Sequence, residues 1–231
     1  MRRGRIARSV QLAVLAGGTV VGVSWQAKAE TAFDPQTVAV NIQRTPAQSW
    51  PGYGIYMGDG LVVTAAHVAG HALLTRPSVV VKGQPLPTES VKEGSYPDND
   101  LTVLRLTPPL PAELAPLHVT LCAEPPKPGE AVKVATPEKV TNSAVISPDI
   151  LPPDMRTRYA ASIKDVYTTG NSGSGVFDAA SRCLLGIMSS KIEQQLHLIV
   201  NGSPTVRTVG LAKHFVPASD IKLFMDGLAK P

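Results

Sequence analysis

Short runs of apolar residues, many of them alternating with polar ones, recur along the chain from residue 37 onward and are separated by glycine, proline and asparagine. Alternation with a period of two is typical of half-buried β-strands, and short continuous apolar runs between turn signals indicate fully buried ones. The pattern therefore predicts a β-rich chain. The expected strands are 37–44, 53–57, 61–65, 78–82 and 101–106 in a first group, and 131–135, 142–146, 159–163, 175–177, 184–189, 196–200 and 205–211 in a second.

Two short turns within these groups have the composition of β-hairpin loops. Gly58-Asp59-Gly60 and Asn201-Gly202 each lie between two apolar runs. Glycine and asparagine tolerate the positive φ that tight hairpin turns require. We therefore expect the two runs on either side of each turn to be antiparallel neighbours.

The two groups are joined by a proline-rich segment, 107–129, which holds seven prolines. Proline fixes φ and lacks a backbone donor, so this segment is expected to be an ordered linker and not a central strand. Only the C-terminal end has helical periodicity, and Ser219 is expected to cap it. The apolar residues of that helix, at i, i+3, i+4 and i+7, are Ile221, Phe224, Met225 and Leu228.

Length and composition fit a folded, β-rich protein. With 231 residues the chain forms one large domain or two small packed ones. Hydrophobic residues make up 43% and charged residues 17%, which allows a sizeable core and argues against disorder and against a nucleic-acid-binding tail. The strand count alone also permits a β-sandwich. Two groups of strands, a proline-rich joint and one terminal helix favour two packed β-barrels.

The first 29 residues have the organisation of a secretory signal peptide. Residues 1–8 hold four arginines and no acid, residues 9–25 are mostly apolar, and 27–29 has the A-x-A form of a cleavage site. An uncleaved membrane anchor is the competing interpretation, but 9–25 is 17 residues with three glycines and would span a bilayer poorly. We expect cleavage after Ala29, a periplasmic or secreted product, and no stable membrane span in that product.

Removal of this segment changes the charge of the chain. The whole chain has 22 basic and 18 acidic residues and a net charge of +4, but five basic residues and no acidic ones lie in 1–29. The mature chain therefore has 17 basic and 18 acidic residues, a net charge of −1. This balance gives no indication of an anionic partner, so no nucleic acid is expected to bind.

The chain has two cysteines, Cys122 and Cys183. An even pair in an exported protein favours one disulfide, and two separately buried thiols are the alternative. The cysteine spacing matches no metal-site pattern. His71 lies four residues after His67 but lacks the glutamate of a metal-binding histidine pair, so it is interpreted as a surface residue. No metal and no cofactor are expected.

Three short segments contain residues suited to acid–base or nucleophilic chemistry. Segment 61–68, LVVTAAHV, places His67 at the end of an apolar strand, and segment 99–106, NDLTVLRL, places Asp100 at the start of another. A carboxylate that enters an apolar strand is partly desolvated and needs donors such as an imidazole N–H. Taken alone, a buried structural histidine and an acid in a solvated turn explain these two segments as well.

The third segment, 169–177, has the sequence TGNSGSGVF and places glycines on both sides of Ser172. Glycines let the backbone turn sharply and direct amide groups toward one point. Acyl transfer needs that geometry, since a nucleophilic hydroxyl must lie beside backbone donors that stabilise the oxyanion. A flexible turn is the alternative for this segment alone, and Ser174 is a rival nucleophile.

In combination and in this order, TAAH around His67, ND-L-x-x-L-x-L around Asp100 and GNSG around Ser172 resemble the trypsin-like serine peptidases. The likeness covers nearly all of the mature chain and is greatest to bacterial glutamyl endopeptidase-like and HtrA-like protease domains. It implies an all-β fold of two packed six-stranded Greek-key barrels with a C-terminal helix. Residues 30–115 and 116–231 would be the two halves of one peptidase domain.

The resemblance also implies a role for each matching residue. Ser172 would be the nucleophile, His67 the general base and then the general acid, and Asp100 the group that orients the imidazole and stabilises its charged form. The oxyanion donors would be the backbone amides of Gly170 and Ser172. Ser174 occupies a position where many members have a second glycine, so Ser172 is preferred. Animal trypsins have an acid where this chain has Asn171, so no zymogen switch through that ion pair is expected.

Specificity is expected to depend on residues before the nucleophile and on the strand that follows it. No acid lies at the base of the expected pocket, and Met188 stands where glutamyl endopeptidases have a histidine, so a modest apolar P1 side chain is expected. The strand edge 189–191 is expected to pair with an extended peptide. The expected substrate-binding residues are Val166, Tyr167, Thr168, Ser189, Ser190 and Lys191.

The resulting hypothesis is a secreted serine endopeptidase that acts on protein or peptide substrates. The oligomeric state is open, with a monomer favoured. The alternative is a non-catalytic peptide- or protein-binding module on the same fold, because function depends on the site and not on the fold. The presence of His67, Asp100 and Ser172 together argues against that alternative, since a pseudoenzyme has no reason to keep all three.

Overall fold

The computed structural model describes residues 33–45, 47, 52–71, 74–164, 171–200 and 203–228. The expected signal peptide, 1–29, lies outside these residues. From Phe33 onward the chain forms one compact unit. The expected boundary between its halves at 115/116 stays a prediction. Within the described residues, no helix is both long enough and apolar enough to cross a membrane.

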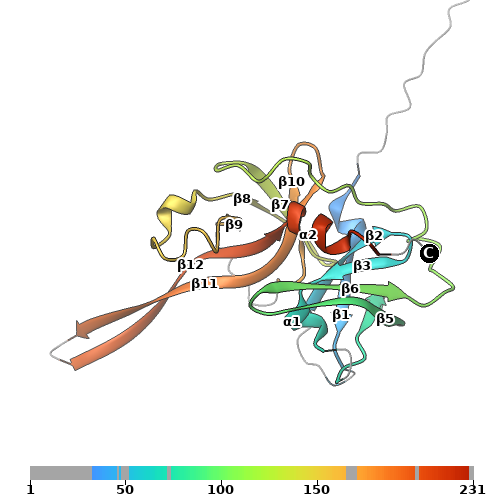
Figure 1. The fold of residues 1–231 in the computed structure, drawn as a ribbon, viewed down its shortest axis with the longest axis horizontal. Helices are drawn as coiled ribbons and strands as arrows, with labels where there is room; N and C mark the ends of the chain where they lie inside the picture. The colour runs from blue at the N-terminus through green and yellow to red at the C-terminus, as the bar shows by residue number, and fades with distance from the viewer. Residues whose placement is uncertain are drawn as a thin grey trace, which may run out of the picture. The chain divides into compact units, whose positions relative to one another are not determined.

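The first half of this unit is a closed barrel in the strand order β1-β2-β3-β6-β5-β4 (Figure 1). A short helix, α1, follows β3, and a 3-10 turn, η1, precedes β1. The bounds are η1 Pro35–Val38, β1 Ala39–Gln43, β2 Gly52–Gly58, β3 Leu61–Thr64, α1 Ala66–Ala69, β4 Ser78–Val81, β5 Gln84–Ser95 and β6 Asn99–Leu106.

The second half is a six-stranded sheet in the order β8-β7-β10-β11-β12-β9. Val145, just after β8, bridges to Ile163 in β9, so the two ends of the sheet meet. When the strands are followed around the sheet and across this bridge, their order in the second half is the same as in the first. The bounds are β7 Ala131–Ala135, β8 Val140–Ala144, η2 Pro148–Ile150, β9 Ser162–Ile163, β10 Gly175–Asp178, β11 Leu184–Val200, β12 Ser203–Pro217 and α2 Ala218–Met225.

This arrangement confirms the predicted all-β fold of two barrels with a C-terminal helix, and it excludes the β-sandwich. The larger buried cluster joins the two halves, because it includes Ile55 and Leu104 from the first, Phe177 and Ile187 from the second, and Phe224 from α2. A second cluster fills the second barrel. Burial of one continuous apolar surface therefore fixes how the two halves pack.

Some local predictions were wrong. The 12-residue strand β5 was not expected, since it is largely polar and contains Pro85 and Pro87. In the structure these prolines lie opposite Val80 and Ser78 of β4, and β5 is held by pairing with β6 along its other side. Ser219 does not cap α2, because the N-cap position is Pro217 and makes no side-chain cap bond.

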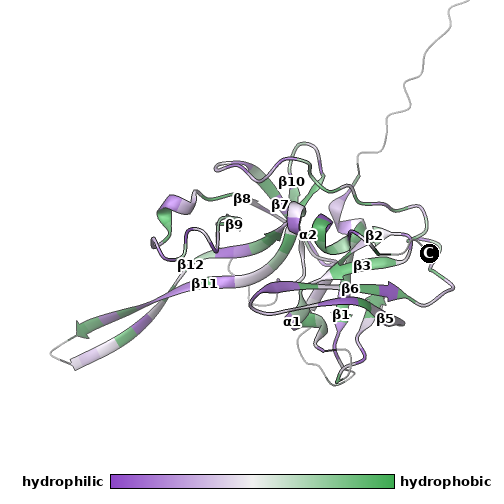
Figure 2. Cartoon of the chain, in the orientation of Figure 1, coloured by the Kyte–Doolittle hydropathy of each residue, from purple (hydrophilic) through white to green (hydrophobic). Residues whose placement is uncertain are grey.

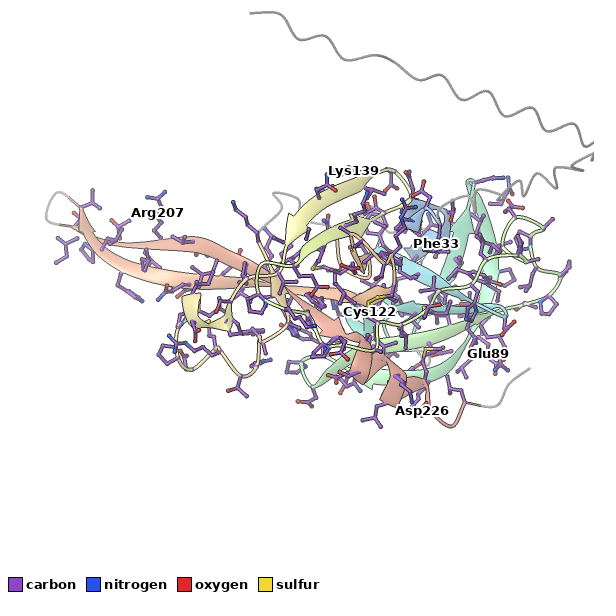
Figure 3. All side chains as sticks on the ribbon, turned by 90° about the horizontal axis from the view of Figure 1, so that it is seen from above. Phe33, Glu89, Cys122, Lys139, Arg207 and Asp226 are labelled. Carbon is purple, nitrogen blue, oxygen red and sulfur yellow. A yellow bond between two sulfur atoms is a disulfide. The ribbon has the colours of Figure 1, made fainter. Side chains whose placement is uncertain are left out.

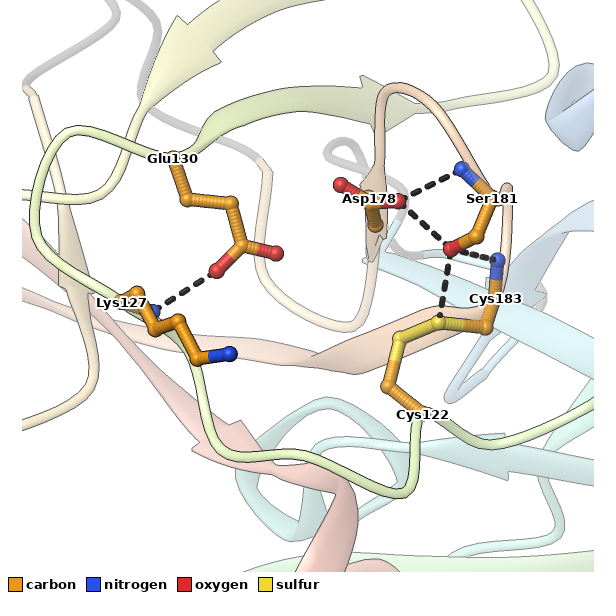
Figure 4. The surroundings of a disulfide bond; sticks show 6 residues. All are labelled: Cys122, Lys127, Glu130, Asp178, Ser181 and Cys183. Carbon is orange, nitrogen blue, oxygen red and sulfur yellow. Dashed lines mark hydrogen bonds between the residues drawn. A yellow bond between two sulfur atoms is a disulfide. The ribbon is translucent and has the colours of Figure 1, made fainter.

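The predicted disulfide between Cys122 and Cys183 is present, with the two Cα atoms 5.0 Å apart (Figure 4). The alternative of two separately buried thiols is therefore wrong. The bond joins the proline-rich linker to the residue that precedes β11, where Cys122 N also donates to Leu184 O at 3.0 Å. The hydroxyl of Ser181 contacts Cys183 Sγ at 3.1 Å. The linker is thus fastened to the second barrel although it forms no strand there.

Candidate active site

His67 and Asp100 come from neighbouring parts of the first barrel. Ala65 is the extended N-cap residue of α1, so the chain turns directly after β3 and presents His67 in the first turn of the helix. Asp100 is the second residue of β6, which pairs with β3. His67 Nδ1 lies 2.8 Å from Asp100 Oδ2, and the backbone amide of His67 donates to Asp100 Oδ1 at 3.0 Å. The carboxylate therefore holds both the ring and the backbone of His67.

The Asp100 carboxylate is only 4% exposed, yet its ionised form is stabilised. Burial by itself would raise the pKa of Asp100. The hydrogen bonds from the His67 ring, the Ser189 hydroxyl and the His67 amide outweigh this effect and hold the pKa below its ordinary value. Ser189 Oγ donates to Asp100 Oδ2 at 2.6 Å. An anion that stays ionised beside Nδ1 favours the tautomer in which His67 carries its proton on that nitrogen.

Ser172 lies in a tight turn whose conformation is restricted by contacts with the rest of the protein. Gly173 has φ +84°, and a Cβ built on it would lie 1.8 Å from the Tyr53 carbonyl oxygen. The turn is tied to both halves, because Gly173 N donates to Met188 O at 2.8 Å and Tyr53 N donates to Ser172 O at 3.0 Å. Only glycine fits at the position after Ser172, since any side chain there would meet backbone from β2.

The rival nucleophile, Ser174, has no accessible surface and donates to the Asn171 carbonyl at 2.5 Å. Ser172, in contrast, is only partly buried. Ser174 thus acts within the turn as a local hydrogen-bond donor, while the hydroxyl of Ser172 faces an open pocket. The choice of Ser172 over Ser174 as the nucleophile stays a prediction.

Ser172 and His67 line one pocket of about 300 Å³. Its described lining residues are His67, Tyr96, Ser172, Ser189, Ser190 and Lys191. Ser172 Oγ donates to the carbonyl of Ser189 at 3.2 Å and not to His67. The hydroxyl and the imidazole therefore share a pocket, and the hydroxyl is held by the strand that forms its opposite wall.

A β-bulge at Ser189 produces this wall. Met188 pairs with Phe215 and Ser190 with His214, which leaves Ser189 as the additional residue on β11. Bulges free one residue from the regular ladder and redirect its side chain. Here the freed side chain donates to Asp100 and the freed carbonyl accepts from Ser172. Sequence reasoning placed Ser189 among the substrate-binding residues but did not identify its contact with Asp100.

A larger pocket of about 710 Å³ adjoins the first and shares Tyr96, Ser189 and Ser190 with it. It also reaches Asp100, and it is lined by Tyr159 and His214, which sequence reasoning missed. No motif pointed to these two residues, because they meet only when β9 packs beside β12.

His214 is a partly buried histidine in this larger pocket. Its Nδ1 lies 2.8 Å from Ala161 O, so Nδ1 carries the proton and donates, and its ring meets Tyr159 edge-on at 5.3 Å. Burial lowers the pKa of His214, and the bond to Ala161 only partly opposes this effect. His214 is consequently held in its neutral form near the charge of Asp100.

The remaining site predictions divide into three groups. Ser189, Ser190 and Lys191 line the pocket, and their role in substrate binding stays a prediction. His71 is exposed as expected, although Glu93 lies 3.9 Å from its ring. Within the described ranges, no group of three or more potential metal ligands is present. The residues Val166, Tyr167, Thr168 and Gly170 lie outside the described part of the chain.

Comparison with known proteins supports the fold but not a closer relationship. No protein-family model and no curated protein matches the sequence. Among solved structures, the chain is similar to the inactive form of the Rv3671c protease, with 18% identity, a TM-score of 0.54, and coverage of 84% of this chain and 90% of the other. The active form of that protease, from Mycobacterium tuberculosis, gives 16% identity, a TM-score of 0.56, and coverage of 85% and 83%.

A serine endoprotease from Yersinia pestis is also similar, with 19% identity, a TM-score of 0.54, and coverage of 86% of this chain and 68% of the other. Identities below one fifth carry information about the fold only. The chain therefore has the fold of the trypsin-like serine proteases, as the sequence motifs predicted.

Proposed function

We propose that the protein is a serine endopeptidase that uses Ser172, His67 and Asp100. One observation carries this proposal: His67, held by Asp100 at 2.8 Å, lines the same pocket as the hydroxyl of Ser172. Residues from three separate segments would thus supply a nucleophile and a base that line one pocket, and an anion bound to that base, on a protease fold. Such a constellation is recognised by its geometry and roles rather than by sequence position.

The reaction would begin when Ser172 Oγ leaves the Ser189 carbonyl and donates to His67 Nε2. Oγ attacks the carbonyl carbon of the peptide, its proton passes to Nε2, and the carbonyl oxygen becomes an oxyanion. The C–N bond then breaks as His67 returns the proton to the leaving amine, which leaves an acyl-enzyme. Water attacks this ester while His67 accepts its proton, and Ser172 regains a proton as the acid product departs. Asp100 stays ionised throughout and stabilises the imidazolium.

The oxyanion donors in this proposal are the backbone amides of Gly170 and Ser172. The substrate would lie along β11 and pair with the edge at 189–191, next to the pocket that these residues line. Val166, Tyr167 and Thr168 would complete the wall before the nucleophile. We infer a modest apolar P1 side chain, because Met188 stands where glutamyl endopeptidases have a histidine and no acid is present at the expected pocket base.

Labelling with a fluorophosphonate probe tests the proposal. The wild-type protein should label at Ser172, Ser172→Ala should not label, and His67→Ala should label at least a hundredfold more slowly. Ser174→Ala, if folded, is the matched serine control and should retain labelling. A folded wild-type protein that stays unlabelled would instead identify a non-catalytic peptide-binding module. A peptide library would then report the P1 residue, and strong preference for Arg, Lys or Glu would contradict the apolar assignment.

We also infer export, with cleavage after Ala29, to the periplasm or the medium. The disulfide between Cys122 and Cys183 supports this inference, since such bonds persist in oxidising compartments. N-terminal sequencing of the protein from the exported fraction should begin at Glu30. An intact N-terminus in the membrane fraction would contradict cleavage. Activity of the form that begins at Glu30 would agree with the absence of a zymogen switch at Asn171.

A further inference from the structure

The strands β11 and β12 continue far beyond the sheet to which they belong (Figure 1). β10 pairs with β11 only at 175–177 and 184–187, and β9 pairs with β12 only at Lys213 and His214. Beyond these positions the two strands pair only with each other, from Glu193–Gly210 to Val200–Ser203. We call residues 193–200 and 203–210 the ribbon. Among the described strands, none pairs with either outer edge of the ribbon.

The end of the ribbon is apolar (Figure 2). Its apolar side chains are exposed. Ile199 is 80% exposed, Val206 55%, Val200 48%, Leu198 40% and Leu196 36%. Successive residues of a strand point to opposite faces, so Leu196, Leu198 and Val200 share one face while Ile199 lies on the other. Contiguous exposed apolar residues on a soluble protein indicate an interaction surface.

The outer edge of β11 lacks the features that normally prevent strand pairing. Natural proteins protect exposed edges with charges, proline or bulges. From Gln194 to Val200 the sequence is QQLHLIV, which has no lysine, arginine, acid or proline, and the register there is continuous. A two-stranded ribbon is only marginally stable by itself in water. Additional pairing along this edge would therefore stabilise it.

The outer edge of β12 is different. Pro204 has no amide to donate, and Arg207 would place two like charges near each other if β12 paired with its own copy. Figure 3 shows Arg207 directed away from the ribbon. The β11 edge has no such obstacle, because an antiparallel copy of 194–200 brings together only amide, imidazole and apolar side chains.

We propose that the β11 edge of the ribbon is a homodimer interface. Two copies pair antiparallel along 194–200 about a two-fold axis, which gives a four-stranded sheet in the order β12-β11-β11-β12 across the two subunits. The interface is self-complementary and closes at two copies. It departs from the monomer that the sequence favoured, and it does not depend on the proposed peptidase activity. Because a single strand pair buries less than the roughly 1,600 Å² of a standard interface, the dimer is reversible and concentration-dependent.

Analytical ultracentrifugation over a range of concentrations tests the proposal. All proteins carry Ser172→Ala, so that self-cleavage does not remove the ribbon. The parent protein should associate to twice its monomer mass and no further. Leu198→Lys introduces a charge at the edge and should raise the dissociation constant at least tenfold. Ile150→Lys is the matched control, since Ile150 is an apolar residue that is 65% exposed but lies outside the ribbon, and it should dimerise as the parent does.

A cysteine scan locates the paired edge. The two native cysteines are bonded to each other, so a cysteine placed at one position from Gln195 to Ile199 is the only free thiol. Residues directly opposite in an antiparallel pair have Cα atoms about 4.5–5.5 Å apart, within reach of a disulfide. Mild oxidation should therefore give covalent dimers at the positions nearest the two-fold axis. Cysteines at Thr205 and Val206 on β12 should give none.

Several results would overturn the proposal. One is a parent protein that stays monomeric at about 100 µM, where a strand-pair dimer should form. The others are dimerisation of Leu198→Lys equal to that of the parent, and cross-linking through β12 alone. A monomer that floats with lipid vesicles and loses this property in Leu198→Lys would assign the ribbon to a membrane surface instead. A monomer whose Leu198→Lys variant, made separately with Ser172 intact, has a higher KM for long peptides would assign the ribbon to the substrate.

Discussion

Ser189 and Asp100 lie on different barrels and are joined by a hydrogen bond of 2.6 Å from the serine hydroxyl to Oδ2. The same serine accepts a bond from Ser172 through its backbone carbonyl. Asp100 in turn holds His67 by its ring and its amide. One residue at a β-bulge thus contacts the acid directly and the serine of the candidate triad through the backbone. This relationship gives the first prediction.

Ser189→Ala should raise the pKa of Asp100, because it removes a donor to the ionised form while burial remains. In the wild type the folded-state pKa lies below the ordinary value of 3.8, so the carboxylate stabilises the fold above that pH. This stabilisation is lost as the pH falls through the folded-state pKa. The variant should lose it at a higher pH and be less stable by about 1–3 kcal/mol at neutral pH.

Denaturant unfolding between pH 2 and 7 measures both effects. Ser190→Ala is the matched control, since Ser190 lines the same pockets and is the next residue on β11. Its free energy of unfolding should fall over the same acidic pH range as that of the wild type. If the stability of Ser189→Ala fell over the same acidic pH range as that of the wild type, the hydrogen bond from Ser189 would not stabilise the ionised form of Asp100.

Gly173→Ala should abolish labelling and destabilise the fold by more than about 4 kcal/mol, because it combines a left-handed backbone with a backbone clash. The added Cβ would lie 1.8 Å from Tyr53 O. Gly129→Ala provides the control, since Gly129 has φ +83° and nothing within 4 Å of an added Cβ. It should cost only the conformational strain, about 1–2 kcal/mol. Equal costs in thermal unfolding would show that β2 can move away from the turn.

His214→Asn should flatten the pH dependence of stability near neutrality. Burial lowers the pKa of His214 from its ordinary value of 6.5, so the fold favours the neutral ring. The stability that the neutral His214 ring contributes is fully present above pH 6.5 and is lost as the pH falls through the folded-state pKa. Asp100 and Asp220 oppose the lowering and Arg158 adds to it. Asparagine keeps a donor for Ala161 O without a titratable ring.

The measurement is the free energy of unfolding at pH 5 and at pH 7.5. The wild type should lose more stability between these values than His214→Asn does. His118→Asn replaces an exposed histidine of the linker and should follow the wild-type profile. If His118→Asn flattened the profile and His214→Asn did not, the titrating histidine would have been misidentified.

Replacing both Cys122 and Cys183 by alanine should lower the free energy of unfolding by about 4 kcal/mol, because the bond closes a loop over a separation of 61 residues. The linker that the bond fastens forms no strand of its own there. Wild-type protein under reducing conditions should unfold at the temperature of the double variant, and reductant should not change the variant. A wild type that is indifferent to reductant would show that the packing around the linker is sufficient alone.

The sequence by itself determined the class of fold, the two groups of strands and the three segments that carry His67, Asp100 and Ser172. These features are local, since hydrophobic alternation, turn residues and short motifs are visible within a few positions. The even pair of cysteines likewise indicated the disulfide that the structure contains. Strand β5 was missed for the same local reason, because its prolines and polar residues disguise a strand that is held by pairing on both sides.

Only the tertiary structure decided which distant groups meet. Ser189 donates to Asp100 across 89 residues of sequence, and His214 approaches Ala161 across 53. Such contacts depend on barrel closure and on a bulge at Ser189, neither of which has a signature in a single segment. The ribbon is a further case in which local sequence does not show which strands pair. The sequence predicted its hairpin turn, but only the register of the sheet revealed that its outer edges have no described partner. Local pattern fixes the elements, whereas burial of a shared apolar core between the halves fixes which of them come together.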